Sequence, residues 1–303
     1  MERTEQIWLD GRFVPWEAAT VHVLTHTLHY GLGVFEGVRC YAGADGSGIF
    51  RLAEHTERLF ASAHILGLEI PFSRDEINAA CVETVRRNRL ESCYIRPLVF
   101  LGDGEMGLAA VHNPVRVAIV VWPWGSYLGD AGVRDGIRVK TSSFQRFPVN
   151  SLMSKAKVVG HYVNSILASV EVRRSGYDEA LMLDTDGFVA ECSGENIFIV
   201  KGGRVKTSPL TSVLPGITRD SVMTLLEDQG IACREERFSR DEVYIADEAF
   251  LTGTAAEITP IRELDDRRIG AGRPGPVTQA LQASYATIVR GEDPRYRRWF
   301  AAV

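Results

Sequence analysis

Asn150-Ser-Leu-Met-Ser-Lys-Ala-Lys157-Val-Val-Gly-His-Tyr162 opens the stretch around which the chain is organised, and Glu191-Cys-Ser-Gly-Glu-Asn196 closes it. Of the 34 lysines and arginines, five are lysines and 29 are arginines. Arginine stays protonated, whereas a buried lysine can lose its proton and form a Schiff base. Lys157 precedes an apolar, helix-like pattern and is therefore the better candidate for the lysine that forms a Schiff base. The alternative is that Lys155 and Lys157 are both solvated charges at the start of a helix.

Length and composition limit the class of protein. A chain of 303 residues predicts two domains, and 45% hydrophobic residues indicate a globular protein. A net charge of -5 gives no basic surface for nucleic acid. No run approaches the ~20 apolar residues of a membrane helix, and the charged first residues predict no secretory signal. Five cysteines without C-x-x-C spacing favour a reducing cytoplasm.

The first part of the chain predicts a small domain at residues 1–122. Alternation around Asp10-Gly11 predicts a hairpin, and a capping box at Ser73 and Glu76 predicts a helix to about Asn88. A helix is expected at 51–63 and strands at 93–101 and 114–121. Glycine and proline at 123–133 indicate an interdomain loop, followed by a second domain at 134–303.

Three candidate sites in the first domain each have a simpler alternative. His22, His26 and His29 have helical spacing, but packing is favoured over metal binding because the H-E-x-x-H pattern is missing. Tyr94 and Arg96 project from the same side of a strand, as a carboxylate clamp or as an edge salt bridge. Arg58 lies beside an apolar helix face, either partly buried with an anionic partner or solvated.

The second domain supplies candidates for one cofactor. Pyridoxal phosphate needs a lysine, an acid opposite the ring nitrogen, a donor to the ring oxygen and a phosphate site. Lys157, Glu191 and Tyr162 are candidates for the first three. The phosphate candidates are Arg58, the helix start near Ile217-Thr218 and the turn at Thr252-Gly-Thr254. Spacing alone leaves open whether these groups meet.

The chain also resembles the branched-chain amino acid aminotransferases, which are class IV aminotransferases with a type IV pyridoxal phosphate fold. The matching segments run in the family's order: residues 29–31, 34–39, 54–59, 94–98, 123–129, 191–196, 214–220 and 252–260. The resemblance implies an α+β fold similar to that of D-amino acid aminotransferase, with a small N-terminal α/β domain and a larger C-terminal pseudo-barrel domain.

The resemblance implies a role for each cofactor residue. Lys157 would form the internal aldimine and move the 1,3-proton, Glu191 would keep the ring nitrogen protonated, and Tyr162 would bond the ring oxygen. The remaining cofactor residues implied are Arg58, Leu214, Ile217, Thr218, Gly253 and Thr254. The chain departs from many relatives at His161 and Cys192, which stand where an asparagine and a glycine are frequent.

Substrate residues are implied in the same way: Tyr30, Phe35, Gly37, Arg39, Tyr94, Arg96, Trp124, Tyr127, Thr254, Ala255 and Ala256. Arg96 would receive the side-chain carboxylate of glutamate or 2-oxoglutarate. The implied reaction moves the amino group of L-leucine, L-isoleucine or L-valine to 2-oxoglutarate, without a metal, in a homodimer or hexamer. Rivals of the same fold are a D-amino acid transaminase, an (R)-amine transaminase and an aminodeoxychorismate lyase; a pyridoxal phosphate store without turnover is a further alternative.

Overall fold

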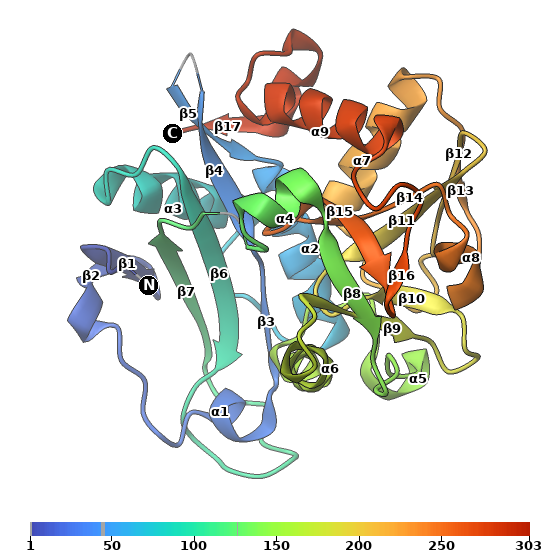
Figure 1. Cartoon of the computed structure of the whole chain (residues 1–303). Coiled ribbons are helices and arrows are strands. Elements are labelled where there is room, and N and C mark those ends of the chain that lie inside the picture. Colours follow the sequence, from blue (N-terminus) through green and yellow to red (C-terminus); the bar gives the residue numbers. More distant parts are fainter. Residues whose placement is uncertain (1, 44–45, 126) are drawn as a thin grey trace. The chain divides into compact units, whose positions relative to one another are not determined.

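The structure is a computed structural model that describes residues 2–43, 46–125 and 127–303. The chain forms two compact units (Figure 1). The first comprises Met1–Trp124, Ala156–His161 and Thr287–Val303, and the second comprises Gly125–Lys155 and Tyr162–Ala286. The domains expected from the sequence, 1–122 and 134–303, assign Ala156–His161 and Thr287–Val303 to the second domain, whereas both segments belong to the first unit. Pairing between distant residues explains them, because Val158 bridges to Val34 and the C-terminal strand joins the first sheet.

In the described residues, the first unit is built on an antiparallel sheet of eight strands. In spatial order its strands are β17 (Phe300–Ala302), β5 (Gly46–Phe50), β4 (Val38–Gly43), β6 (Cys93–Leu101), β7 (Val115–Trp122), β1 (Gln6–Leu9) and β2 (Arg12–Pro15), while β3 (Gly33–Phe35) also pairs with β6. The predicted N-terminal hairpin is confirmed: Asp10 and Gly11 take positive φ values of 48° and 88° between β1 and β2.

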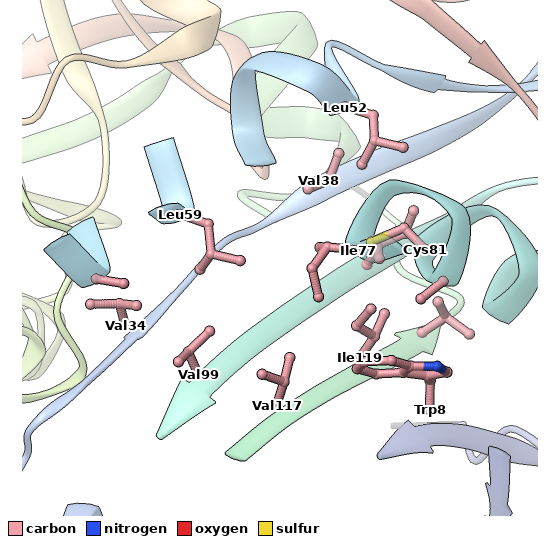
Figure 2. Packing of buried hydrophobic residues seen from close by; sticks show 14 of the residues in the cluster. Trp8, Val34, Val38, Leu52, Leu59, Ile77, Cys81, Val99, Val117 and Ile119 are labelled. Atoms are coloured by element: carbon pink, nitrogen blue, oxygen red, sulfur yellow. The ribbon is translucent and has the colours of Figure 1, made fainter. Parts of the chain in front are cut away.

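Helices of the first unit follow the signals in the sequence. They are η1 (Trp16–Ala18), α1 (His26–Tyr30), α2 (Leu52–Ile65), α3 (Arg74–Arg87), η2 (Val159–His161) and η3 (Pro294–Trp299). The predicted capping box is confirmed, since Ser73 and Glu76 exchange side-chain and backbone hydrogen bonds at the start of α3. The apolar faces of α2 and α3 pack on the sheet in one core that includes Leu59, Ile77 and Val99 (Figure 2).

Within the part of the chain that the structure describes, the second unit is built on a mixed, curled sheet of nine strands. In order they are β10 (Val189–Cys192), β9 (Glu179–Leu183), β8 (Ile137–Thr141), β15 (Glu257–Leu264), β14 (Glu248–Gly253), β11 (Asn196–Lys201), β12 (Arg204–Thr207) and β13 (Cys233–Glu235), with β16 (Arg267–Arg268) paired to β15. Strand β8 is parallel to both of its neighbours. The rings of Phe198 and Phe250 stack across β11 and β14, with their centroids 5.1 Å apart.

The helices of the second unit are α4 (Asp130–Asp135), α5 (Val149–Leu152), α6 (Tyr162–Arg174), α7 (Ile217–Asp228), α8 (Arg240–Tyr244) and α9 (Pro276–Val289), whose last residues belong to the first unit. The helix expected near Lys157 is present and starts slightly later, with the 3-10 turn η2 at Val159–His161 leading directly into α6 at Tyr162. Lys157 itself lies just before this helix, where Val158 bridges to Val34 and the Lys157 carbonyl accepts from the Phe35 amide at the end of β3. None of the described helices is long and apolar enough to cross a membrane.

Candidate active site

Lys157 is held in the first unit through its backbone. Its carbonyl accepts a hydrogen bond from the Phe35 amide at 3.1 Å, and its amide donates to the Ser62 hydroxyl at 3.0 Å. Its Nζ lies 5.0 Å from the centroid of the Phe35 ring. Lys155, by contrast, is exposed and belongs to the second unit. Its Nζ donates to the Val213 carbonyl of the same unit at 3.3 Å. The two lysines thus have different surroundings although one residue separates them.

Arg58, on α2, has the carboxylate partner that partial burial requires. Its Nε and Nη2 donate to the two oxygens of Glu36 at 2.6 and 2.8 Å, and its side chain is 11% exposed. His55, one turn earlier on α2, lies 2.7 Å from the same carboxylate through Nδ1. The alternative of a solvated arginine is therefore excluded. Glu36 and His55 fall within the matching segments 34–39 and 54–59, but the sequence alone assigns them no role.

Arg96 lies among aromatic rings on the central strand β6. Its guanidinium carbon is 4.7 Å from the Phe35 ring centroid, 5.4 Å from that of Tyr94 and 5.5 Å from that of Trp122. Its buried Nε has no hydrogen-bond acceptor within the described chain, and no ion pair is found for it there. Because β6 is flanked on both sides, Arg96 does not lie on a sheet edge, and the carboxylate clamp stays a prediction.

Tyr94 is buried against the other aromatic residues of this group. Its ring meets that of Trp124 edge-on at 4.6 Å between centroids. Gly37 lies so close that an added Cβ would be 1.8 Å from the Tyr94 hydroxyl, so only glycine fits there. Arg39 pairs with Tyr94 across β4 and β6. The first unit therefore brings Phe35, Gly37, Arg39, Tyr94, Arg96 and Trp124 to one region; Tyr30, on α1, is largely exposed.

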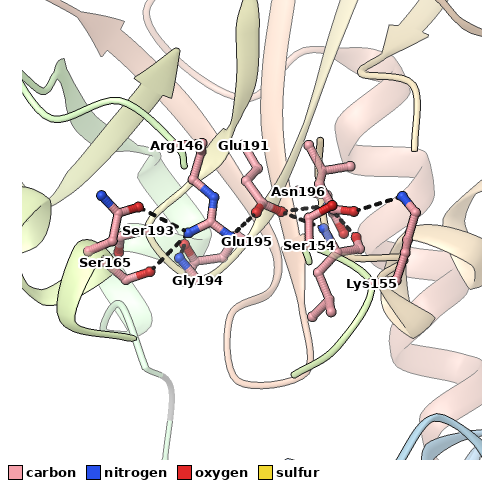
Figure 3. Close-up of polar contacts among 12 residues, drawn as sticks. Arg146, Ser154, Lys155, Ser165, Glu191, Ser193, Gly194, Glu195 and Asn196 are labelled. Carbon is pink, nitrogen blue, oxygen red and sulfur yellow. Dashed lines mark hydrogen bonds and ion pairs between the residues drawn. The ribbon is translucent and has the colours of Figure 1, made fainter. Parts of the chain in front are cut away.

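Glu191, in the second unit, sits at the end of β10 and is 5% exposed. Its Oε1 is 2.6 Å from Nη2 of Arg146, and its Oε2 accepts from the Asn196 side chain and the Leu214 amide, each at 3.3 Å (Figure 3). The carboxylate is thus fixed by a buried cation and two neutral donors. Arg146 was missed from the sequence. Its position between Phe144 and Phe147 is the signal that could have identified a buried, partnered arginine.

Asn196 also positions the loop before α7. Its Nδ2 donates to the Leu214 carbonyl at 3.1 Å, and an added Cβ at Gly216 would be 2.0 Å from its Oδ1. Gly216 is the N-cap residue of α7, so Ile217 and Thr218 are its first residues. Backbone amides at a helix start are free of helical partners and attract anions. The turn predicted at Thr252-Gly-Thr254 is present but lies slightly later: Thr252 and Gly253 end β14, and Thr254, Ala255 and Ala256 connect it to β15.

The other expected residues of the second unit lie as follows. Tyr162 is the first residue of α6, and Tyr127 lies three residues before the start of α4. Burial raises the pKa of the Tyr127 hydroxyl to about 12, with Glu195 and Glu179 adding to the effect. Cys192 is buried, and burial followed by three nearby glutamates raises its thiol pKa. Among the described residues, no cluster of three or more His, Cys, Asp or Glu side chains could hold a metal ion.

The comparisons with known proteins extend over nearly the whole chain. The family model "Amino-transferase class IV" matches residues 33–264. A branched-chain-amino-acid aminotransferase of Pseudomonas aeruginosa is 56% identical over 98% of this chain and 97% of its own. The crystal structure of the Escherichia coli branched-chain enzyme has a TM-score of 0.96 at 44% identity, covering 98% and 99% of the two chains. The branched-chain enzyme of Thermobaculum terrenum, solved in its PLP-form, has a TM-score of 0.92 at 37% identity, covering 99% of each chain.

Proposed function

Since the chain belongs to the class IV aminotransferases, we propose that it transfers the amino group of L-leucine, L-isoleucine or L-valine to 2-oxoglutarate with pyridoxal phosphate as cofactor. The products are the branched-chain 2-oxo acids and L-glutamate. Full-length identity of 44–56% to branched-chain enzymes supports both the reaction and the substrate class.

One observation carries the substrate assignment: Arg96 is set among Phe35, Tyr94 and Trp122 with a buried, unpartnered Nε. Both substrates of a transaminase must use the same binding site in turn. Aromatic surfaces suit the aliphatic side chain of leucine, and a guanidinium suits the second carboxylate of 2-oxoglutarate. The arrangement therefore supports alternate binding of an apolar and an acidic side chain.

The residues present fit pyridoxal phosphate by their chemistry. The first unit offers an amine and a guanidinium, and the second offers a carboxylate fixed by Arg146 and the amides at the start of α7. When bound, the cofactor supplies an aldehyde for the amino group and a ring that accepts electrons from the substrate Cα. The residues that we assign to it are Arg58, Lys157, Tyr162, Glu191, Leu214, Ile217, Thr218, Gly253 and Thr254.

Lys157 is assigned both the covalent attachment and the proton transfer. Its Nζ would hold the cofactor's aldehyde and, as a free amine, would move the proton taken from the substrate Cα. Glu191, paired with Arg146, would accept a hydrogen bond from the ring nitrogen and favour its protonated form. Tyr162 would donate a hydrogen bond to the ring oxygen. The ion pair of Arg146 and Glu191 supports this assignment because it keeps a negative charge at a buried position.

Substrate residues are assigned from the family resemblance. They are Tyr30, Phe35, Gly37, Arg39, Tyr94, Arg96 and Trp124 in the first unit, and Tyr127, Thr254, Ala255 and Ala256 in the second. The Tyr94 hydroxyl and the amides of 254–256 would take the α-carboxylate, and the aromatic residues would enclose the side chain. The small side chains of Ala255 and Ala256 suit a turn in which backbone amides approach a ligand.

A substrate comparison tests the proposed function. We expect the purified protein to convert leucine with 2-oxoglutarate, and leucine alone to change the absorption band of the bound cofactor. D-alanine and (R)-1-phenylethylamine should be much poorer donors. Activity restricted to either of these two would reject the assignment, and a cofactor spectrum that does not respond to any amine would indicate storage without turnover.

Replacing Arg96 with methionine should separate the two substrates. Losing a charge-assisted hydrogen bond to the second carboxylate should lower kcat/KM for 2-oxoglutarate by roughly 10- to 100-fold, since such bonds contribute about 1.5–3 kcal/mol. The value for leucine should change by only a few fold, because methionine keeps the apolar contacts. Steady-state kinetics with each substrate varied measures both.

Arg116→Met is the matched control for Arg96→Met. Arg116 lies on the neighbouring strand β7, packs over Phe100 and pairs with the half-exposed Asp10. Its loss should leave both kcat/KM values unchanged. Equal losses for leucine and 2-oxoglutarate in the Arg96 variant would contradict the assignment of Arg96 to the acidic substrate.

We further propose that the protein is a homodimer or a larger homo-oligomer. Helix α6 exposes Val163, Ile166, Leu167 and Val170 at helical spacing, and each is more than 40% exposed in the single chain. In the first unit, Val23, Leu28, Met106 and Leu108 are also exposed. Apolar faces of this kind are typical of surfaces that a partner covers. Sedimentation velocity tests this proposal: we expect a mass of two or more chains, and the mass of a single chain would contradict it.

A cytoplasmic location is proposed on the state of the cysteines. All five, Cys40, Cys81, Cys93, Cys192 and Cys233, are free thiols, and four of them are buried. Free buried thiols are usual in a reducing compartment. Fractionation of cells that produce the protein tests this proposal.

A further inference from the structure

Glu36 is a fully buried carboxylate at the bend between β3 and β4. Its backbone amide donates to the Pro97 carbonyl at 2.8 Å, which ties the bend to β6. Its Oε1 accepts from Arg58 Nε, and its Oε2 accepts from Arg58 Nη2, His55 Nδ1 and the Gly37 amide. Burying a charged carboxylate costs free energy, which the donors around Glu36 offset. So many donors gathered on one buried group call for a functional explanation.

The charges around Glu36 keep it ionised. Burial raises the pKa of Glu36, but the attraction of Arg58 and His55 and the hydrogen bonds from both outweigh that effect and hold the pKa well below its usual range. Burial lowers the pKa of His55, with Arg58 and Lys157 acting in the same direction and Glu36 opposing them. His55 donates through Nδ1–H because a carboxylate can only accept, and Arg58 carries the permanent positive charge opposite Glu36.

The two hydrogen bonds between Glu36 and Arg58 fix both the position and the plane of the guanidinium. A guanidinium is a planar fork, so two parallel hydrogen bonds to one carboxylate define both its position and its plane. These bonds use Nε and one N–H of Nη2, which form one edge of the fork. The other N–H groups point away from Glu36 by the geometry of the guanidinium alone.

We propose that Glu36 is a positioning residue for the cofactor phosphate: it orients Arg58, with His55 holding Glu36 in place from the same helix. This inference rests on the proposed assignment of Arg58 to the phosphate. Arginine side chains have several flexible bonds, and fixing one in advance lowers the entropic cost of binding a ligand. Glu36 itself does not touch the phosphate and acts only through Arg58.

The test compares two ligands that differ only in the phosphate. Protein freed of cofactor is titrated with pyridoxal phosphate and with pyridoxal, and each dissociation constant is measured from the absorbance of the bound aldehyde. In Glu36→Gln, pyridoxal phosphate should bind about tenfold more weakly or worse, as for the loss of one charge-assisted hydrogen bond. Pyridoxal should bind with less than about a twofold change, because it lacks the group that Arg58 contacts.

Two further variants keep the test decisive. Glu36→Asp retains the charge, and so protects the fold, but withdraws the carboxylate by one methylene group; it should show the same selective loss. Glu54→Gln is the matched control, because Glu54 also pairs with an arginine of this region, but with Arg51 at the start of α2. It should bind both ligands as the unchanged protein does.

The outcomes separate this inference from the proposed function. If the unchanged protein fails to bind pyridoxal phosphate at Lys157, the proposed function fails. If Arg58→Met retains the preference for pyridoxal phosphate over pyridoxal, the assignment of Arg58 fails. If Arg58→Met loses that preference while both Glu36 variants retain it, or weaken both ligands equally, the positioning role of Glu36 is overturned. Adding Glu36→Gln to Arg58→Met should lower the preference no further.

Discussion

Replacing Lys157 with arginine is expected to abolish transamination, with kcat reduced by about four orders of magnitude or more. Arginine keeps a positive charge and a similar length, but it cannot form the Schiff base or give up its proton. The loss combines covalent attachment with general acid–base catalysis, which alone contributes about 10²- to 10⁴-fold. Rates with leucine and 2-oxoglutarate measure the effect, and borohydride reduction followed by peptide mapping shows which lysine was attached.

Lys155→Arg is the matched control for this variant. Lys155 lies two residues away, is exposed, and donates to the Val213 carbonyl through its Nζ, so arginine should preserve nearly full activity. The fold should survive in both variants, because the bonds that hold Lys157 to Phe35 and Ser62 come from its backbone. Borohydride labelling of Lys155, or turnover in Lys157→Arg close to that of the unchanged protein, would contradict the assignment.

Local elements could be predicted from the sequence because their causes are local. The hairpin at Asp10-Gly11 needs two residues with positive φ, and the helix α3 needs the capping box of Ser73 and Glu76. Strand β6 was recognised by alternation, which also placed Tyr94 and Arg96 on one side. The structure confirms these features because the signals lie within a few residues of each other.

The partners of the buried charges could not be predicted, because they come from distant parts of the chain. Glu36 and Arg58 are 22 residues apart, and Arg146 lies 45 residues before Glu191. A sequence can indicate that a buried arginine needs an anion, but not which carboxylate provides it. The same applies to the surroundings of Lys157: the apolar pattern predicted the helix that follows it, but not the pairing of Val158 with Val34 that holds this segment against β3.

Replacing Glu191 with alanine is expected to impair both stability and catalysis. Arg146 is 10% exposed at its side chain, and removing Glu191 would leave its charge buried without the carboxylate. Breaking a buried ion pair from one side costs about 3–5 kcal/mol. Catalysis should fall by about 10²- to 10³-fold, as for loss of one preorganised electrostatic group, because the ring nitrogen loses its acidic partner. Urea unfolding and single-turnover rates with leucine measure the two effects.

A double substitution separates these two effects. In Arg146→Met combined with Glu191→Leu, no charge is left unpaired, and apolar residues of similar volume can replace a buried ion pair at little cost. The double variant should therefore recover most of the stability lost in Glu191→Ala, yet remain as impaired in its rate, because neither new side chain can hold a proton on the ring nitrogen. If catalysis returned together with stability, Glu191 would be a structural partner of Arg146 alone. If the double variant stayed as unstable as Glu191→Ala while Arg146→Met alone was as stable as the unchanged protein, the unpaired charge of Arg146 would not explain the stability lost in Glu191→Ala.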